Sequence, residues 1–183
     1  DNLILLTVGT GIGGGIIING RLYSGASGSA GEIGHTTIDV NGPRCVCGNT
    51  GCLEALVSGT AVTKEAIRRI RQGERSSLTE IVEGKIENIT AEKVSIAAQD
   101  GDSLTSKVIL KAATYLGVGL VNLVNIFNPE MIIISGSVAK MGDLLLNPAR
   151  QVVRERAFQL SAQVVQIVPA QLGDDAGVLG AVI

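Results

Sequence analysis

The spacing of apolar and polar positions changes along this chain, and the first stretch has the pattern of β-hairpins. Residues 3–8 (LILLTV) form an apolar run of strand length, and a second apolar run follows a cluster of glycines and ends at Asn19-Gly20. Asn-Gly between apolar runs is the strongest short-range signal for a tight hairpin turn. The pattern therefore predicts a strand, a glycine turn, a second strand and a hairpin.

Further along, apolar positions recur mainly with a helical period, separated by short strand-like runs. Thr60 and Thr90 have the character of helix N-caps, and Gly73 that of a helix stop. We expect a loop at 24–34, helices at 60–73, 90–102, 103–127 and 143–160, a turn at 136–142, strands at 35–40, 131–135 and 162–168, and a further helix from 173. Strands that alternate with helices predict an α/β domain.

Composition and charge narrow the kind of protein. Hydrophobic residues make up 45% of the 183 residues but aromatic residues only 2%, so the core must be aliphatic. A net charge of −2 without a basic tract argues against a nucleic-acid surface. No apolar run reaches the roughly 18 residues of a membrane span, and the N-terminus lacks a basic segment, so we expect neither a transmembrane helix nor a signal peptide.

The cysteines indicate a cellular compartment, and the two chain ends indicate whether the domain is complete. Three clustered cysteines do not make a disulfide framework, which favours a reducing, cytoplasmic setting. The chain starts directly on the strand at 3–8 and stops inside its last expected helix. We therefore expect a fragment of a larger protein.

Three glycines form a candidate phosphate loop. Gly9, Gly11 and Gly14 match the spacing G-x-G-x-x-G of dinucleotide-binding loops, but that interpretation needs a helix directly after the loop, and a strand follows here. The Gly-Lys-Ser/Thr of a P-loop is absent as well. A glycine turn between antiparallel strands can still present amides to a phosphate, with the Thr10 hydroxyl as an extra donor. The alternative is a hairpin without a ligand, and the loop alone does not decide between them.

The single histidine and all three cysteines form a candidate metal site. They are His35, Cys45, Cys47 and Cys52, and the glycines among them let the chain double back. A Cys₃His set is typical of a closed tetrahedral zinc site. The alternative is a set of unrelated reduced cysteines, which fits poorly in a polar, glycine-bearing segment. Because four protein ligands fill the coordination sphere, the sequence predicts a structural zinc ion that does not activate water.

These segments resemble a known family. Residues 32–35 (EIGH) and 45–54 (CVCGNTGCLE) resemble the E-x-G-H and C-x-C-G-x₂-G-C-x-E elements of the ROK family of repressors, open reading frames and sugar kinases. Residues 7–16 resemble its second phosphate motif, and residues 125–139 and 171–181 its adenosine-side region and C-terminal helix. The resemblance covers the whole chain and is strongest to bacterial glucokinases, N-acylhexosamine kinases and the sugar-sensing domains of repressors.

The resemblance implies a fold and a set of site residues. The fold would be an actin-like, ribonuclease-H-like ATPase of two lobes, with residues 1–183 as the C-terminal lobe carrying an inserted zinc-binding loop. By this resemblance, the residues that would contact the sugar hydroxyls are Glu32, His35 and Glu54, and His35 would also bind zinc. Mg-ATP would contact Thr10 and Gly11 with its γ- and β-phosphates and would place its adenosine near Gly136. Taken singly, the two glutamates also suit solvated loop positions.

Two departures from the family pattern affect the kinase interpretation. Where the family often has three glycines, this chain has Ser135-Gly136-Ser137, and Ser137 would crowd the nucleotide. The family also implies an aspartate base in an Asn-Asp element upstream of the first glycine loop. Asp1-Asn2 has the reverse order and lies too close to the first strand. The base is therefore expected upstream of Asp1, together with the N-terminal lobe and any DNA-binding domain.

Three functions are weighed on this basis. The first is the lobe of a kinase that phosphorylates glucose or an N-acylhexosamine with Mg-ATP, which the glycine loop favours because a sensor needs no γ-phosphate site. The second is the sugar-sensing domain of a repressor, and the third is a zinc-stapled domain without a ligand. The helix expected at 103–127 is strongly apolar, and the family resemblance implies dimers or tetramers, so we expect a homodimer or a higher homo-oligomer.

Overall fold

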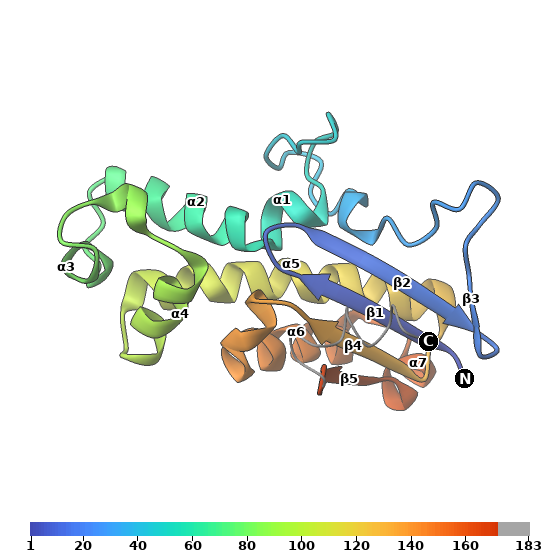
Figure 1. Cartoon of the computed structure of the whole chain (residues 1–183). Coiled ribbons are helices and arrows are strands. Elements are labelled where there is room, and N and C mark those ends of the chain that lie inside the picture. Colours follow the sequence, from blue (N-terminus) through green and yellow to red (C-terminus); the bar gives the residue numbers. More distant parts are fainter. Residues whose placement is uncertain (172–183) are drawn as a thin grey trace.

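The fold is built on one five-stranded sheet with strand order β3-β2-β1-β4-β5. The computed structural model describes residues 1–171. The strands are β1 (Leu3–Val8), β2 (Ile12–Ile18), β3 (Arg21–Leu22), β4 (Met131–Ser135) and β5 (Gln166–Pro169). β1 is antiparallel to β2 and parallel to β4, and β4 is parallel to β5. The sheet thus joins an antiparallel N-terminal part to a parallel part with helical connections (Figure 1).

The opening strands confirm the expected hairpins. β1 covers residues 3–8 as predicted, and Asn19 and Gly20 turn β2 into β3 with φ angles of 51° and 74°. Positive φ at both central residues is the turn geometry that Asn-Gly favours. Along β1 the side chains of Ile4, Leu6 and Val8 are buried, whereas those between them are at least partly exposed. The buried side of the sheet therefore faces the core.

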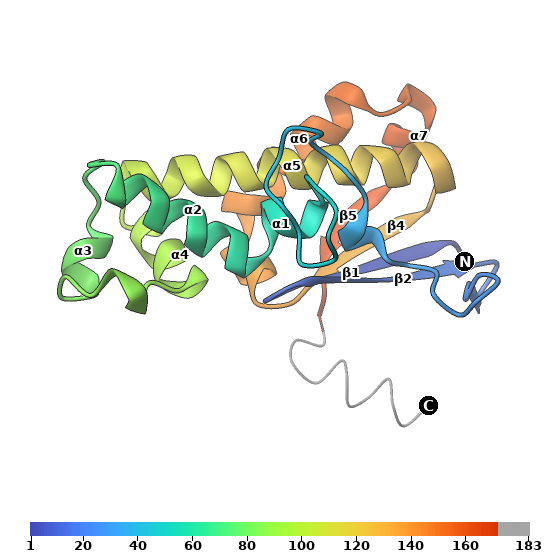
Figure 2. The same ribbon diagram turned by 90° about the horizontal axis from the view of Figure 1, so that it is seen from above.

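The helices gather on one face of the sheet (Figure 2). They are α1 (Leu53–Val57), α2 (Gly59–Arg71), α3 (Leu78–Ile81), α4 (Ala91–Gln99), α5 (Ser103–Phe127), α6 (Asp143–Arg156) and α7 (Gln159–Val164), with 3₁₀ turns at Ile33–His35, Ile86–Asn88 and Val138–Met141. α5 is central and contacts α1, α2, α4 and α6. Asp102 caps its start by accepting a hydrogen bond from the Thr105 amide, and left-handed Asn128 ends it.

Several expected helices are confirmed, but one cap was misplaced and the short helices α1, α3 and α7 were not predicted. α5 spans 103–127 as predicted, and Thr90 caps α4. The N-cap of α2 is Ser58, whose hydroxyl accepts a hydrogen bond from the Ala61 amide, and not Thr60. α1 was not predicted because its five residues are too short to show a helical period.

The strand expected at 35–40 is wrong. The chain there leaves the 3₁₀ turn Ile33–His35 and makes only an isolated bridge between Thr37 and Cys52. The amides of Ile38 and Asp39 both donate to the carbonyl of Gly51. This segment is therefore the base of a loop, since its hydrogen bonds go to that loop and not to a neighbouring strand.

Two boundaries near the C-terminus are also wrong. α6 ends at Arg156 instead of 160, because Ala157 is extended and the Phe158 amide donates to the side chain of Asn125 on α5. A separate helix, α7, then occupies the beginning of the expected strand, which starts at Gln166 instead of 162. The expected turn at 136–142 contains a 3₁₀ helix. The helix expected from 173 lies outside the described residues.

α5 is long and apolar enough to cross a membrane by length and composition alone. However, 56% of its most apolar window is buried inside the protein. α5 contacts α1, α2, α4, α6 and α7, and this burial is that of a core helix.

Candidate functional site

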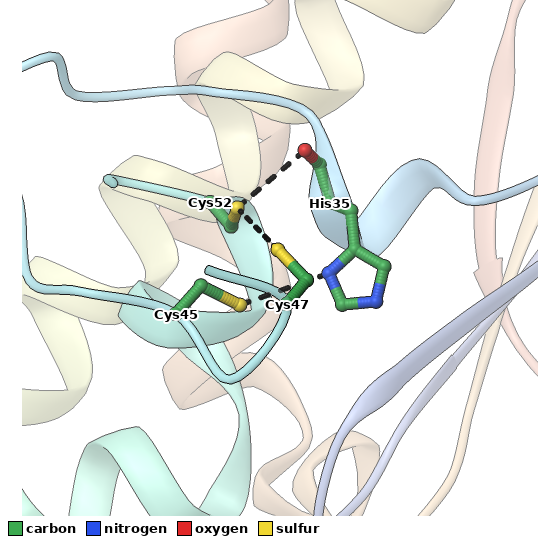
Figure 3. A group of neighbouring side chains, drawn as sticks. All are labelled: His35, Cys45, Cys47 and Cys52. Carbon is green, nitrogen blue, oxygen red and sulfur yellow. Dashed lines mark hydrogen bonds between the residues drawn. The ribbon is translucent and has the colours of Figure 1, made fainter. Parts of the chain in front are cut away.

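The structure brings the four candidate metal ligands together (Figure 3). One ligand atom from each of His35, Cys45, Cys47 and Cys52 lies within 4.8 Å of the other three. Cys45 Sγ is 3.7 Å from His35 Nδ1, and Cys47 Sγ is 3.7 Å from Cys52 Sγ. A tetrahedral zinc ion with Zn–S bonds of about 2.3 Å needs sulfurs about 3.8 Å apart. The donor set and its spacing therefore fit a zinc ion.

Residues 39–52, here called the metal loop, fold back tightly so that the three thiols meet. The Cys45 amide donates to the Asn49 carbonyl and the Gly48 amide to the Cys45 carbonyl, at 2.8 and 3.0 Å. Gly51 has a φ of 68°, and a Cβ there would collide with the backbone of Asp39. Only glycine suits this position, because both the dihedral angle and the close approach exclude a side chain.

The pKa values of two of the thiols shift in opposite directions. Burial, reinforced by the neighbouring cysteine sulfurs, raises the pKa of Cys52 to about 12. A hydrogen bond from the Asn49 amide lowers the pKa of the exposed Cys47. A divalent cation favours the thiolate form strongly, so a bound metal would reverse the effect at Cys52.

Two residues expected to contact a sugar, the metal ligand His35 and its neighbour Glu32, lie together on one side of the metal group. His35 turns Nδ1 towards Cys45, which leaves Nε2 pointing away from the cysteines (Figure 3). Glu32 Oε2 lies 3.9 Å from this Nε2, and its side chain is 69% exposed. Glu32 and His35 therefore form one polar surface that is open to solvent.

The third of these residues, Glu54, links two parts of the site. It lies in α1, two residues after Cys52. Its Oε2 accepts a hydrogen bond from the Ile12 amide at 2.8 Å, and its Oε1 lies 3.8 Å from Cys45 Sγ. The sequence did not predict that one carboxylate would join the metal ligands to the end of the glycine loop.

Residues 9–11, here called the glycine loop, connect β1 to β2. The Gly9 amide donates to the Gly11 carbonyl at 2.9 Å. Within residues 1–171, the amides of Thr10 and Gly11 donate to no protein acceptor. Two adjacent free amides in a glycine turn are suited to bind an anion.

The start of α2 holds this loop in place. The Gly9 carbonyl accepts a hydrogen bond from the Gly59 amide at 2.7 Å, and the Thr10 carbonyl accepts one from the Thr60 hydroxyl at 2.9 Å. The positive end of a 13-residue helix therefore lies against the loop. Neither Gly59 nor Thr60 was predicted to contact the glycine loop, although Ser58, directly before the helical period, was a usable signal for the start of the helix.

Gly136 lies at the same end of the sheet, directly after β4. Its φ is 90°, and a Cβ there would approach the Val8 carbonyl oxygen to 2.5 Å. Ser137 Oγ is 3.8 Å from the position that a Cβ would take at Gly9. Ser137 also lines a cavity of about 510 Å³ with residues of α4. The structure thus brings Thr10, Gly11 and Gly136 to one end of the sheet.

Comparison with solved structures shows which known fold this is. The structure is similar to that of a ROK family glucokinase from Streptomyces griseus in complex with glucose and AMPPNP, with a TM-score of 0.89 and 35% identity, covering 99% of this chain and 59% of that one. The fold is the mixed α/β fold of the ROK kinases, which is of the actin-like ATPase type.

Sequence comparison extends this result to the family. The ROK family model matches residues 1–183. The chain is 42% identical to a glucokinase of Halalkalibacterium halodurans, over 98% of this chain and 54% of that protein, and 40% identical to a xylose repressor of Caldicellulosiruptor bescii, over 100% of this chain and 45% of that protein. The chain belongs to the ROK family, and it spans about half the length of the curated relatives that it matches.

Proposed function

We propose that this chain is the sugar- and phosphate-binding lobe of an ATP-dependent sugar kinase that acts on glucose or an N-acylhexosamine. In this proposal residues 1–183 form the C-terminal lobe of a two-lobed protein. The aspartate base lies upstream of Asp1, so this lobe holds the sugar and the nucleotide phosphates but does not remove the proton. The glucokinase relatives support this proposal.

One observation carries the proposal: the carboxylate of Glu54 joins the metal ligands to the glycine loop. Phosphoryl transfer requires the sugar hydroxyl and the terminal phosphate to be held close together and in line. Glu54 touches Cys45 on one side and the Ile12 amide on the other, at 3.8 and 2.8 Å. A sugar held at this carboxylate would therefore lie next to a phosphate on the Thr10 and Gly11 amides.

We propose that zinc on His35, Cys45, Cys47 and Cys52 keeps the metal loop in shape. A zinc-bound thiolate at Cys45 has no proton to donate, so Oε1 of Glu54 would be left as an acceptor for a sugar hydroxyl. His35 would use Nδ1 for zinc and keep Nε2, beside Glu32, for the sugar. The ion would be structural, because its four ligands leave no open position.

We propose that Mg-ATP places its γ- and β-phosphates on Thr10 and Gly11 and its adenosine beyond Gly136. The free amides and the start of α2 support the phosphate assignment. The 510 Å³ cavity between α4 and Ser137 has a volume suited to a small ligand. Ser137 sits between this cavity and the glycine loop, where it would narrow the path of the nucleotide.

The second candidate is the sugar-sensing domain of a repressor. The 40% identity to a xylose repressor over the full chain is the observation in its favour. A repressor would keep sugar binding at Glu32, His35 and Glu54 without turnover. Cytoplasmic location and a homodimer stay predictions under either proposal.

A coupled assay of ADP release by the full-length protein distinguishes the kinase from the repressor. We expect turnover that depends on glucose, N-acetylglucosamine or N-acetylmannosamine, with xylose included as the repressor ligand. Isothermal titration with the same four sugars accompanies the assay. Sugar binding without ADP release from any of them would reject the kinase and leave the repressor.

A further inference from the structure

The metal loop has a second anchor, on the surface of α5. The hydroxyl of Tyr115 donates a hydrogen bond of 3.0 Å to Oδ2 of Asp39, a residue 76 positions away in the sequence. Both side chains are partly buried. In Figure 1 the metal loop projects above α1, and in Figure 2 it passes over α5. This hydrogen bond therefore ties the base of the loop to the central helix.

Asp39 connects the two ends of the loop to each other. Its Oδ1 accepts the Asn41 amide at 3.0 Å and its carbonyl accepts the Gly42 amide at 2.9 Å, which turns the chain into the loop. Its own amide donates to the carbonyl of Gly51 at 3.2 Å, where the chain leaves the loop. Fixing this one residue thus fixes both sides of the segment that carries the cysteines.

α5 supports the same segment one helical turn further along. Gly119, four residues after Tyr115 and so on the same helix face, lies under Leu53, whose side chain would be 3.0 Å from a Cβ at that position. Leu53 stands between Cys52 and Glu54 and donates its amide to the Thr36 carbonyl at 3.0 Å. The Leu53–Gly119 contact fixes how closely the end of the metal loop packs against α5, and the Tyr115 hydrogen bond fixes the position of its beginning, at Asp39.

We infer that Tyr115 is a positioning residue that holds the metal loop, and with it His35 and Glu54, in the geometry that binds the sugar. This rests on the proposed function for its link to the sugar, but not for its link to the loop. Burial, with the Asp39 carboxylate, raises the pKa of Tyr115, so the hydroxyl keeps its proton as a donor. The proposal assigns a role in sugar affinity to a side chain outside the metal group and outside the glycine loop.

The test uses the full-length protein with Tyr115→Phe, which removes one oxygen atom. Tyr23→Phe is the matched control, because Tyr23 is the other tyrosine of the chain and is 49% exposed beside β3. We expect Tyr115→Phe to speed hydrogen exchange of the amides at 39–52 about tenfold, as the loss of a hydrogen bond to a charged group does. The dissociation constant for glucose, or for xylose if that is the sugar bound, should rise roughly three- to tenfold, with that for AMPPNP unchanged.

Asp39→Ala closes a double-mutant cycle. In that background Tyr115→Phe should change neither exchange nor sugar affinity, because the partner is already gone. Unchanged exchange in Tyr115→Phe, or effects of the two substitutions that simply add, would overturn the inference. A looser loop with unaltered sugar affinity would overturn the link to the sugar. If the unsubstituted protein binds no sugar, the proposed function fails, and hydrogen exchange still decides whether Tyr115 orders the loop.

Discussion

The metal loop and helix α5 touch each other, yet they are ordered by different physical means. Val40 and Val46 of the loop are 78% and 91% exposed, and its buried side chains include the candidate ligands Cys45 and Cys52. α5 instead buries thirteen of its 25 residues, nearly all of them aliphatic or small. Ligand chemistry would order the first region and apolar burial the second, so loss of the metal should leave α5 folded, and a change in the apolar core of α5 should leave the metal bound.

Loss of the metal should have the largest effect, and it should be local. Cys47→Ala removes one of four proposed ligands, and zinc contributes roughly 10–16 kcal/mol of apparent binding free energy in small zinc domains. We expect zinc below half an equivalent, disorder at 41–53 and a lower melting temperature. Elemental analysis, hydrogen exchange and thermal denaturation measure these three effects. The control is Val46→Ala at the exposed neighbouring position, and full zinc occupancy in Cys47→Ala would contradict the ligand assignment.

A substitution in the core of α5 should lower the stability of the whole domain but leave the metal bound. Leu120 on α5 is completely buried, and Leu120→Ala should lower the free energy of unfolding by about 2–5 kcal/mol while zinc stays bound. Chemical denaturation and metal analysis of the folded protein test this. Leu110→Ala, at a position on the same helix that is 53% exposed, is the control and should cost far less. Zinc loss in folded Leu120→Ala would show that the two regions are not independent.

Glu54 lies where the loop, α1 and the glycine loop meet, and its substitution should affect binding more than stability. Glu54→Ala should weaken sugar binding at least about tenfold, since a hydrogen bond to a charged group is worth about 1.5–3 kcal/mol. Zinc should be retained, because Glu54 is not a ligand. Glu54→Gln keeps an acceptor for the Ile12 amide and separates loss of charge from loss of that hydrogen bond. Sugar affinity equal to that of the parent in Glu54→Ala would remove it from the site.

The smallest expected effect concerns the ion pairs of Glu65, two of which lie within α2 while the third, with Lys111, joins α2 to α5. Arg68 first, and then Lys111 and Arg69, hold the pKa of Glu65 at about 2, below its ordinary 4.5. A carboxyl whose pKa is lowered by folding stabilises the protein above its unfolded pKa, and this contribution is lost as the pH falls from about 4.5 to 2. We expect at most about 1 kcal/mol, as is usual for surface pairs. Glu65→Gln should flatten the unfolding free energy over this pH interval, and an unaltered profile would contradict the assignment.

Features with a local signal were predicted well. Residues 3–8, the Asn19-Gly20 turn and the helix at 103–127 each carry their pattern within a few neighbouring positions, and all three are confirmed. The spacing of the cysteines and His35 likewise predicted a cluster that the structure assembles. One segment was not resolved: residues 35–40 were interpreted as a strand, yet within residues 1–171 they form only the isolated Thr37–Cys52 bridge.

Contacts between segments that are distant in the sequence could not be predicted from the pattern of residues. Ser58 and Thr60 both suit an N-cap by type, and in the structure the Thr60 hydroxyl instead donates to the Thr10 carbonyl, fifty positions away. The sequence could name Glu54 as a ligand candidate but could not place it between Cys45 and the Ile12 amide. Local spacing determines which turns, helices and ligand sets can form, because their hydrogen bonds and coordination close within a short segment. Packing of the sheet, α1 and α5 decides which of those groups meet, because such contacts depend on the path of the whole chain.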